Sequence, residues 1–231
     1  MAFRIGYVFG QKPQLWYHLP AIDTFNLLSK IYELKEEDYR KRLNYLVELF
    51  EIKDLIDIPV RKLSLGQRMR CEIVGSLLHK PEILFLDEPT IGLDIIAKQK
   101  IRELIMDLNK KEKITILLTS HDTQDIERLC KRIIIINHGK MIYDGNVDKL
   151  KTDYLKNKIV SVKLEEEFNG LNLNGVRIVN SNKYSVDLEV NTEKTSIKRL
   201  IDELMKKYEI ADITILNTPI EEVITEIYRK K

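Results

Sequence analysis

The stretch Ile83-Leu84-Phe85-Leu86-Asp87-Glu88-Pro89-Thr90 decides the fold class of this chain. Four consecutive apolar residues are typical of a strand that is buried on both faces. Two carboxylates follow at the carboxyl end of the strand, where ligands bind in open α/β sheets. One acid there can hold Mg²⁺ through water, and its neighbour can orient an attacking water. A strand that merely ends in a polar turn would explain the same pattern.

Further strands flank this one along the chain. Residues 4–9 predict a short buried strand, and 116–118 and 133–136 form short apolar runs. The repeat across 101–108 predicts a helix between the deciding stretch and 116–118. Apolar strands separated by helices predict a parallel sheet covered on both faces. After the last of these strands, residues 138–143 predict a turn and a hairpin.

A helical region precedes the deciding stretch. Residues 22–52 show helical periodicity, and a face from Tyr39 to Phe50 is apolar. In Leu63-Ser64-Leu65-Gly66-Gln67-Arg68, Ser64 and Gln67 predict a capping box at the start of the next helix. Capping does not explain Gly66, because glycine in a helix costs about 1 kcal/mol relative to alanine. A glycine there lets a phosphate approach the bare N–H groups of the helix start, so both interpretations stay open.

The character of the chain changes after about residue 148. Residues 160–164 and 184–190 alternate between apolar and polar, as half-exposed antiparallel strands do. Helical periodicity follows over 197–208, then a strand at 213–215 and a capped helix from Thr218. We therefore predict a main domain over 1–150, a linker over 151–158 and a small α+β domain over 159–231.

Composition narrows the classes of function. The 231 residues carry 38 basic and 36 acidic side chains, a net charge of +2, which gives nucleic-acid binding no electrostatic support. The longest apolar runs have four residues, against about 20 for a membrane span. No secretory leader is recognisable, and two distant cysteines suggest a reducing compartment rather than a disulfide framework.

The order and spacing of these motifs resemble the nucleotide-binding domain of ATP-binding cassette (ABC) proteins over about residues 1–150. The matching segments are Gln11 for the Q-loop, Leu63 to Gln67 for the signature, Ile83 to Glu88 for Walker B and the catalytic glutamate, Gly92-Leu93-Asp94 for the D-loop, and His121 for the switch histidine. Leu65 departs from the signature, which usually has glycine there. The ending from Thr218 to Tyr228 is similar, more weakly, to the tail of drug- and lipid-type exporters.

The resemblance implies a P-loop-NTPase-like parallel sheet with a helical signature subdomain, and ATP and Mg²⁺ as cofactors. It implies that Asp87 and Gln11 attend the metal and that Glu88 and His121 are catalytic. Ser64, Gly66, Gln67 and Asp94 would bind the nucleotide across a dimer with a second ABC ATPase subunit. A separate transmembrane permease would dock on 22–62, near Trp16 and Tyr17, at the cytoplasmic face of the membrane.

No G-x-x-x-x-G-K-[ST] sequence occurs in the 231 residues, although a P-loop should precede Gln11. We therefore expect the sheet core to be incomplete at its amino end and the isolated chain to bind ATP poorly. The alternatives are a degenerate, non-catalytic cassette that acts only as an interaction partner, or an ABC ATPase outside transport. The latter usually carries two cassettes or long coiled coils, and neither is visible in this sequence.

Overall fold

The computed structural model describes residues 2–10, 12–154 and 157–217, and its contacts divide the chain into two units. The first unit runs from Met1 to Cys130 and the second from Lys131 to Lys231. The boundary expected near residue 150 and the linker over 151–158 stay predictions. Gln11 and the helix predicted from Thr218 lie outside the described residues.

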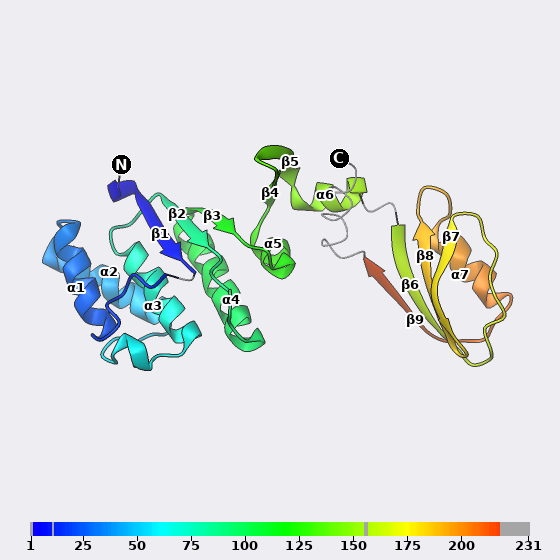
Figure 1. Cartoon of the computed structure of the whole chain (residues 1–231), viewed down its shortest axis with the longest axis horizontal. Coiled ribbons are helices and arrows are strands. Elements are labelled where there is room, and N and C mark those ends of the chain that lie inside the picture. The colour runs from blue at the N-terminus through cyan, green and yellow to red at the C-terminus, as the bar shows by residue number, and fades with distance from the viewer. Residues whose placement is uncertain (1, 11, 155–156, 218–231) are drawn as a thin grey trace. The chain divides into compact units, whose positions relative to one another are not determined.

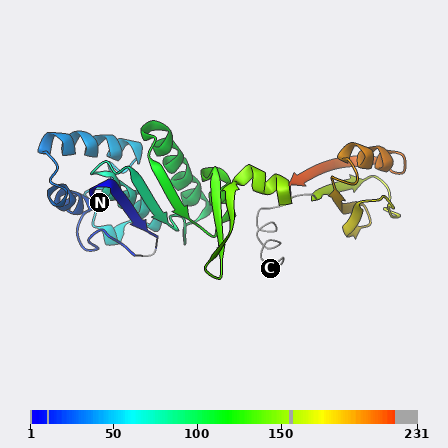
Figure 2. The same ribbon diagram turned by 90° about the horizontal axis from the view of Figure 1, so that it is seen from above.

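The first unit is a mixed α/β structure around one parallel sheet, which confirms the predicted fold class (Figure 1). Its strands run side by side in the order β1-β2-β3 in both ribbon views (Figures 1 and 2). Their bounds, with those of the helices, are β1 Ile5–Phe9, α1 Ala21–Ile31, α2 Glu36–Leu49, α3 Leu65–Leu77, β2 Ile83–Asp87, α4 Ile95–Glu112, β3 Thr115–Thr119 and α5 Thr123–Leu129, with short 3₁₀ turns at Ala2–Arg4 and Val60–Lys62.

One face of this sheet forms the core. Val8, Leu84 and Leu86 are at most 1% exposed and pack with the apolar faces of the helices. The face of α2 that the sequence predicts is buried in the same cluster, since Tyr39, Leu43, Leu46, Val47 and Phe50 all belong to it. The helical part and the sheet therefore share one hydrophobic core.

The other face is open, so the prediction of a sheet covered on both faces is wrong for the described part of the chain. Tyr7, Phe9 and Leu117 are 37%, 39% and 47% exposed. The ring of Tyr7 packs on those of Phe9 and Phe85, with centroids 4.0 and 5.9 Å apart. The apolar runs did indicate strands, but the helices that the structure describes pack their apolar residues against the Val8 face.

The second unit begins with the predicted hairpin, β4 Arg132–Asn137 and β5 Lys140–Asn146, followed by α6 Val147–Tyr154. The isoleucine strand β4 does not join the parallel sheet. It pairs antiparallel with β5 in a two-stranded sheet of its own, because a two-residue turn returns the chain directly beside it.

A four-stranded antiparallel sheet completes the second unit, in the order β7-β8-β6-β9. Its elements are β6 Asn157–Leu164, β7 Val176–Asn182, β8 Ser185–Asn191, α7 Ile197–Met205 and β9 Ile210–Asn217. Alternate residues such as Val160, Val162 and Leu188 are buried with Leu200 and Leu204 of α7. The predicted α+β character is present, but the sequence did not indicate β7, because its residues are mostly exposed and do not alternate.

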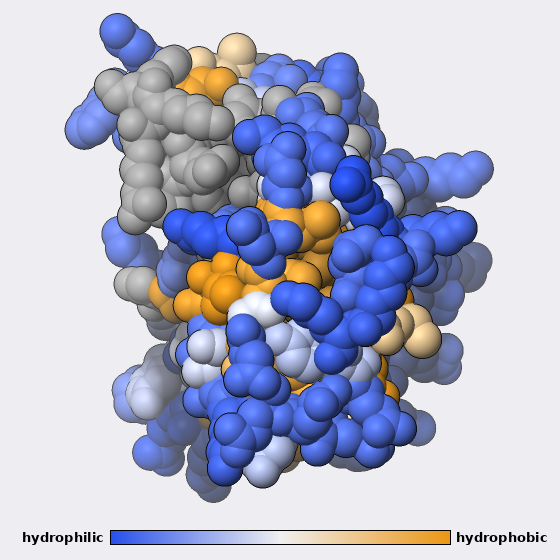
Figure 3. Space-filling model, turned by 90° about the vertical axis from the view of Figure 1, so that its right-hand side faces the viewer, coloured by the Kyte–Doolittle hydropathy of each residue, from blue (hydrophilic) through white to orange (hydrophobic). Residues whose placement is uncertain are grey.

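The chain is 32% charged residues, and much of its drawn surface is hydrophilic. The face in Figure 3 is mostly hydrophilic, with an apolar patch near its centre. None of the described helices has both the length and the apolar character that crossing a membrane requires.

The two faces of the parallel sheet predict different mutational costs. Leu84→Ala removes a fully buried side chain and should lower the free energy of unfolding by about 2–5 kcal/mol. Leu117→Ala, on the open face of β3, should cost less than about 1 kcal/mol. Urea unfolding followed by the fluorescence of Trp16, the one tryptophan of the chain, measures both. Equal losses in the two variants would contradict the assigned core.

Candidate functional site

The parallel register brings three strand ends to one edge of the first sheet. Phe9, Asp87 and Thr119 lie level with one another. Just beyond them, the Gly10 amide donates to the Asp87 carbonyl at 2.7 Å, and the Glu88 amide donates to the Thr119 carbonyl at 3.0 Å. A Cβ on Gly10 would lie 2.3 Å from the Glu88 carbonyl oxygen, so only glycine fits this approach.

Asp87 ends β2 with one oxygen held in place. Its Oδ1 accepts a hydrogen bond from the Thr119 hydroxyl at 2.5 Å. Among the described residues no further hydrogen bond to this carboxylate is found, and no group of three His, Cys, Asp or Glu could enclose a metal. One oriented carboxylate without a cage fits Mg²⁺, which usually keeps several waters and is bound through one or two carboxylates plus substrate phosphates.

Glu88 is held in an unusual backbone conformation beside His121. Its φ is +52°, in the left-handed region, which costs a non-glycine residue about 1–3 kcal/mol. Its Oε1 lies 2.7 Å from Nδ1 of His121, and the two side chains are 24% and 75% exposed. The segments just beyond the ends of β2 and β3 thus place a carboxylate and an imidazole in direct contact, open to solvent.

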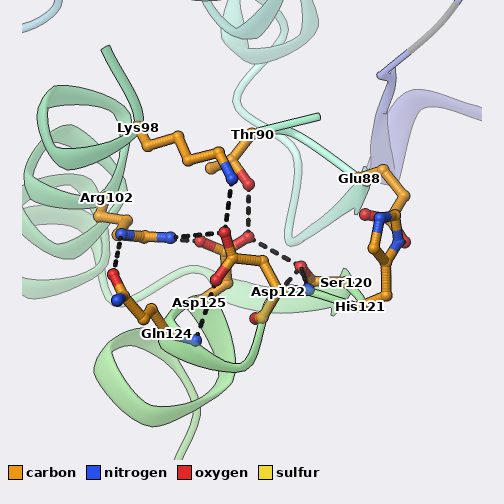
Figure 4. A network of polar contacts seen from close by, with 9 residues as sticks. All are labelled: Glu88, Thr90, Lys98, Arg102, Ser120, His121, Asp122, Gln124 and Asp125. Atoms are coloured by element: carbon orange, nitrogen blue, oxygen red, sulfur yellow. Dashed lines mark hydrogen bonds and ion pairs between the residues drawn. The ribbon is translucent and has the colours of Figure 1, made fainter. Parts of the chain in front are cut away.

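A polar network with a buried centre lies beside this pair (Figure 4). At its centre is Asp125 of α5, with no exposed surface. Its Oδ2 accepts from the hydroxyls of Thr90 at 2.6 Å and Ser120 at 2.8 Å, and its Oδ1 accepts from Nε of Arg102 at 2.6 Å. Asp125 therefore ties the segment that follows Glu88 to the segment that carries His121.

A second carboxylate completes the network. Asp122 caps α5 by accepting from the Gln124 amide at 3.0 Å, and its Oδ2 pairs with Lys98 at 2.7 Å. Nη2 of Arg102 lies 3.1 Å from the same oxygen, although without hydrogen-bond alignment. Burial raises the pKa of Asp122, but Lys98, the Gln124 amide and Arg102 together hold it below its ordinary value.

The sequence alone does not reveal this network. Asp122 and Asp125 look like an N-cap and an acidic residue in the first turn of a helix, which is an ordinary helix start. Arg102 lies within a helical repeat and looks like a surface residue. An arginine and an acid that are both buried can be recognised only after α4 and α5 are packed together.

The predicted signature residues lie at the start of α3, and the predicted capping box is present. Ser64 accepts from the Gln67 amide at 3.2 Å, and the Gln67 side chain accepts from the Ser64 amide at 2.9 Å. A Cβ on Gly66 would lie 3.0 Å from Cβ of Ala97 in α4. The close packing of the two helix starts therefore explains why a residue without a side chain occupies this position.

Asp94 starts the neighbouring helix. Its Oδ1 accepts from the Ala97 amide at 2.8 Å, which makes it the N-cap of α4. The structure thus brings together Asp87, Glu88 and His121 at the sheet edge, and Ser64, Gly66, Gln67 and Asp94 at two adjoining helix starts. Among the described residues, no hydrogen bond or ion pair joins the two groups of side chains.

Fold and site together define a mixed α/β protein whose parallel sheet presents paired acids and a histidine at its carboxyl edge. Residues 2–91 match the ABC transporter family. The chain is 33% identical over 147 residues to the ABC transporter ATP-binding protein NatA of Bacillus subtilis, covering 64% of this chain and 59% of NatA. It is 28% identical over 227 residues to an uncharacterized ABC transporter ATP-binding protein of Alkalihalophilus pseudofirmus, covering 96% and 84%.

A solved structure is similar to this chain in both fold and sequence. The chain superposes with a TM-score of 0.58 and 31% identity on cbiO1 from Clostridium perfringens, part of the ABC transporter complex cbiONQ, covering 65% of this chain and 60% of that one. In sequence and in fold the chain is thus similar to ABC transporter ATP-binding proteins. It spans about 59% of the length of NatA and 60% of cbiO1.

The buried network predicts a large cost when its centre is removed. Asp125→Ala leaves Arg102 buried without its main partner and should lower the free energy of unfolding by about 3–5 kcal/mol. Glu37→Ala breaks an exposed pair with Lys41 on α2 and should cost less than about 0.5 kcal/mol. Urea titration with Trp16 fluorescence compares them. A loss below about 1 kcal/mol for Asp125→Ala would contradict the role of the network.

Proposed function

We propose that this chain is the ATP-binding and ATP-hydrolysing subunit of an ABC transporter. The observation that carries the proposal is the 2.7 Å contact between Glu88 Oε1 and His121 Nδ1, next to Asp87 at the same sheet edge. A carboxylate beside an imidazole, with a second carboxylate one residue away, supplies groups that could orient a water and a phosphate.

Each residue has a separate task in this proposal. Asp87, fixed by Thr119, would hold Mg²⁺, which neutralises charge on the phosphates when it is bound. Glu88 would polarise the attacking water, and its position is set by its strained backbone. His121 would contact the terminal phosphate from the exposed side of Glu88. Gln11, by its resemblance to the Q-loop glutamine, would attend the metal and the membrane partner.

The starts of α3 and α4 would serve a second nucleotide site. Backbone N–H groups at a helix start favour an anion, and Gly66 adds no side chain to the first turn of α3. Ser64, Gln67 and Asp94 flank that turn. Because no hydrogen bond or ion pair links them to Asp87, Glu88 or His121, we assign them to the nucleotide of a partner subunit, which is a second copy or a related ATPase.

The partner in the membrane would be a separate permease, so the chain would lie peripherally on the cytoplasmic face. The family and the place of cbiO1 in a transporter complex support a permease partner. The export direction rests on the resemblance of the segment after Thr218, and the permease would set the substrate. We do not propose a nucleic-acid partner, because the net charge is +2.

A second candidate function is that of a non-catalytic partner in an ABC dimer. Such a partner would offer only Ser64, Gly66 and Asp94 to the nucleotide of the other subunit. The two functions differ in whether Asp87, Glu88 and His121 bind the phosphates of a nucleotide.

ATP binding by the 231-residue chain measures how weak the affinity for Mg-ATP is without a P-loop motif among these residues. Three charge-assisted hydrogen bonds contribute about 5–9 kcal/mol, which corresponds to roughly three to six powers of ten in affinity. Titration calorimetry should therefore detect no micromolar binding of Mg-ATP, with NatA as the positive control. A dissociation constant in the micromolar range would contradict the prediction.

Hydrolysis tests the proposed function itself. In a chain joined ahead of Met1 to a P-loop segment, Glu88→Gln should lower kcat by at least about 100-fold, because general-base catalysis contributes roughly 10²–10⁴-fold. ATP affinity should change less than about threefold. Asp107→Asn, an exposed change on α4, is the matched control and should leave kcat unchanged. If the joined chain binds ATP but never hydrolyses it, the non-catalytic function is favoured instead.

A further inference from the structure

A buried carboxylate in the middle of α3 makes contacts that the proposed chemistry does not use. Glu72 is 3% exposed and is surrounded along the helix by buried Cys71, Ile73 and Val74. Its two oxygens each lie 3.1 Å from the Gln14 amide nitrogen, and Oε1 lies 3.4 Å from that of Leu15. The acid therefore accepts hydrogen bonds from the loop that follows Gln11.

The position is costly for a charged residue. Burial raises the pKa of Glu72, while the amides of Leu15 and Gln14 and the charge of Arg68 act in the opposite direction. An apolar residue would avoid this desolvation. Two consecutive amides without an acceptor would then lose their partners, which is also costly. The carboxylate fits the site because its two oxygens can accept from neighbouring N–H groups at once.

A second helix captures the next amide. The Trp16 amide donates to the Thr24 hydroxyl of α1 at 3.1 Å, and Thr24 is 5% exposed. Side chains of two helices thus satisfy three consecutive amides in a segment that forms no helix or strand of its own. The same segment presents Trp16 and Tyr17 to solvent, 46% and 49% exposed.

We propose that Glu72 is a positioning residue that fixes loop 12–19 to helix α3. The helix that begins beside Ser64 and the loop that follows Gln11 then move as one body. This inference rests on the proposed function in one respect, since there the helix start faces a nucleotide and the loop faces the membrane partner. The attachment itself is a property of the chain without nucleotide.

Loop attachment can be measured directly in the nucleotide-free 231-residue chain. Glu72→Ala should raise the amide exchange rates of Gln14 and Leu15 at least tenfold, which corresponds to about 1.4 kcal/mol. Trp16, the one tryptophan, should show a larger fast component in its fluorescence anisotropy decay. A residue that only stabilised the fold would instead raise exchange along α3 and the core. Glu48→Ala, an exposed change on α2, is the matched control.

Glu72→Gln keeps one acceptor oxygen, and it tests the positioning role of Glu72 if the alanine variant does not fold. It should raise exchange at Gln14 or Leu15 at least threefold, with the exchange of Ile73 and Val74 unchanged. Exchange and anisotropy within twofold of the unaltered chain, in a folded variant, would overturn the positioning role. Because no ATP is present, failure here is distinct from failure of the proposed hydrolysis.

Discussion

The shared register of three parallel strands is the constraint on which the site depends. Side chains on neighbouring strands can meet at the sheet edge only because Phe9, Asp87 and Thr119 end level with one another. Every residue of a strand alternates between faces, so a slip of one residue would turn the Asp87 side chain away from Thr119. The Gly10 and Glu88 amides, bonded across the strand ends, help to fix that register.

Buried acids then fix the loops that leave the sheet. Asp125 joins Thr90 to Ser120, and Glu72 accepts from the loop at Gln14 and Leu15. In both places a carboxylate in a helix satisfies polar groups of a segment without regular structure, where apolar packing could not. The pairing of catalytic candidates and the placing of the loop thus use one physical device, at the cost of desolvating a charge.

Much of this could be predicted from the sequence, because strand ends and helix caps depend on neighbouring residues. The acids after Leu86 and the capping box at Ser64 are such local signals. The strand at 133–136 does not join the parallel sheet that its apolar run predicts, since such a run does not reveal its pairing partner. The sequence does not reveal the buried roles of Asp125 and Glu72, because burial of a helical acid depends on what packs over it. The open face at Tyr7 could not be predicted, since periodicity does not show which residues cover a strand.

The register itself can be measured without any ligand. Trans-hydrogen-bond scalar couplings in a deuterated, ¹⁵N,¹³C-labelled chain report which amide donates to which carbonyl. The account predicts couplings from the Glu88 amide to the Thr119 carbonyl and from the Gly10 amide to the Asp87 carbonyl, whose N···O distances are 3.0 and 2.7 Å. Couplings to carbonyls one residue away on either strand would contradict it, because Asp87 would then not lie level with Thr119.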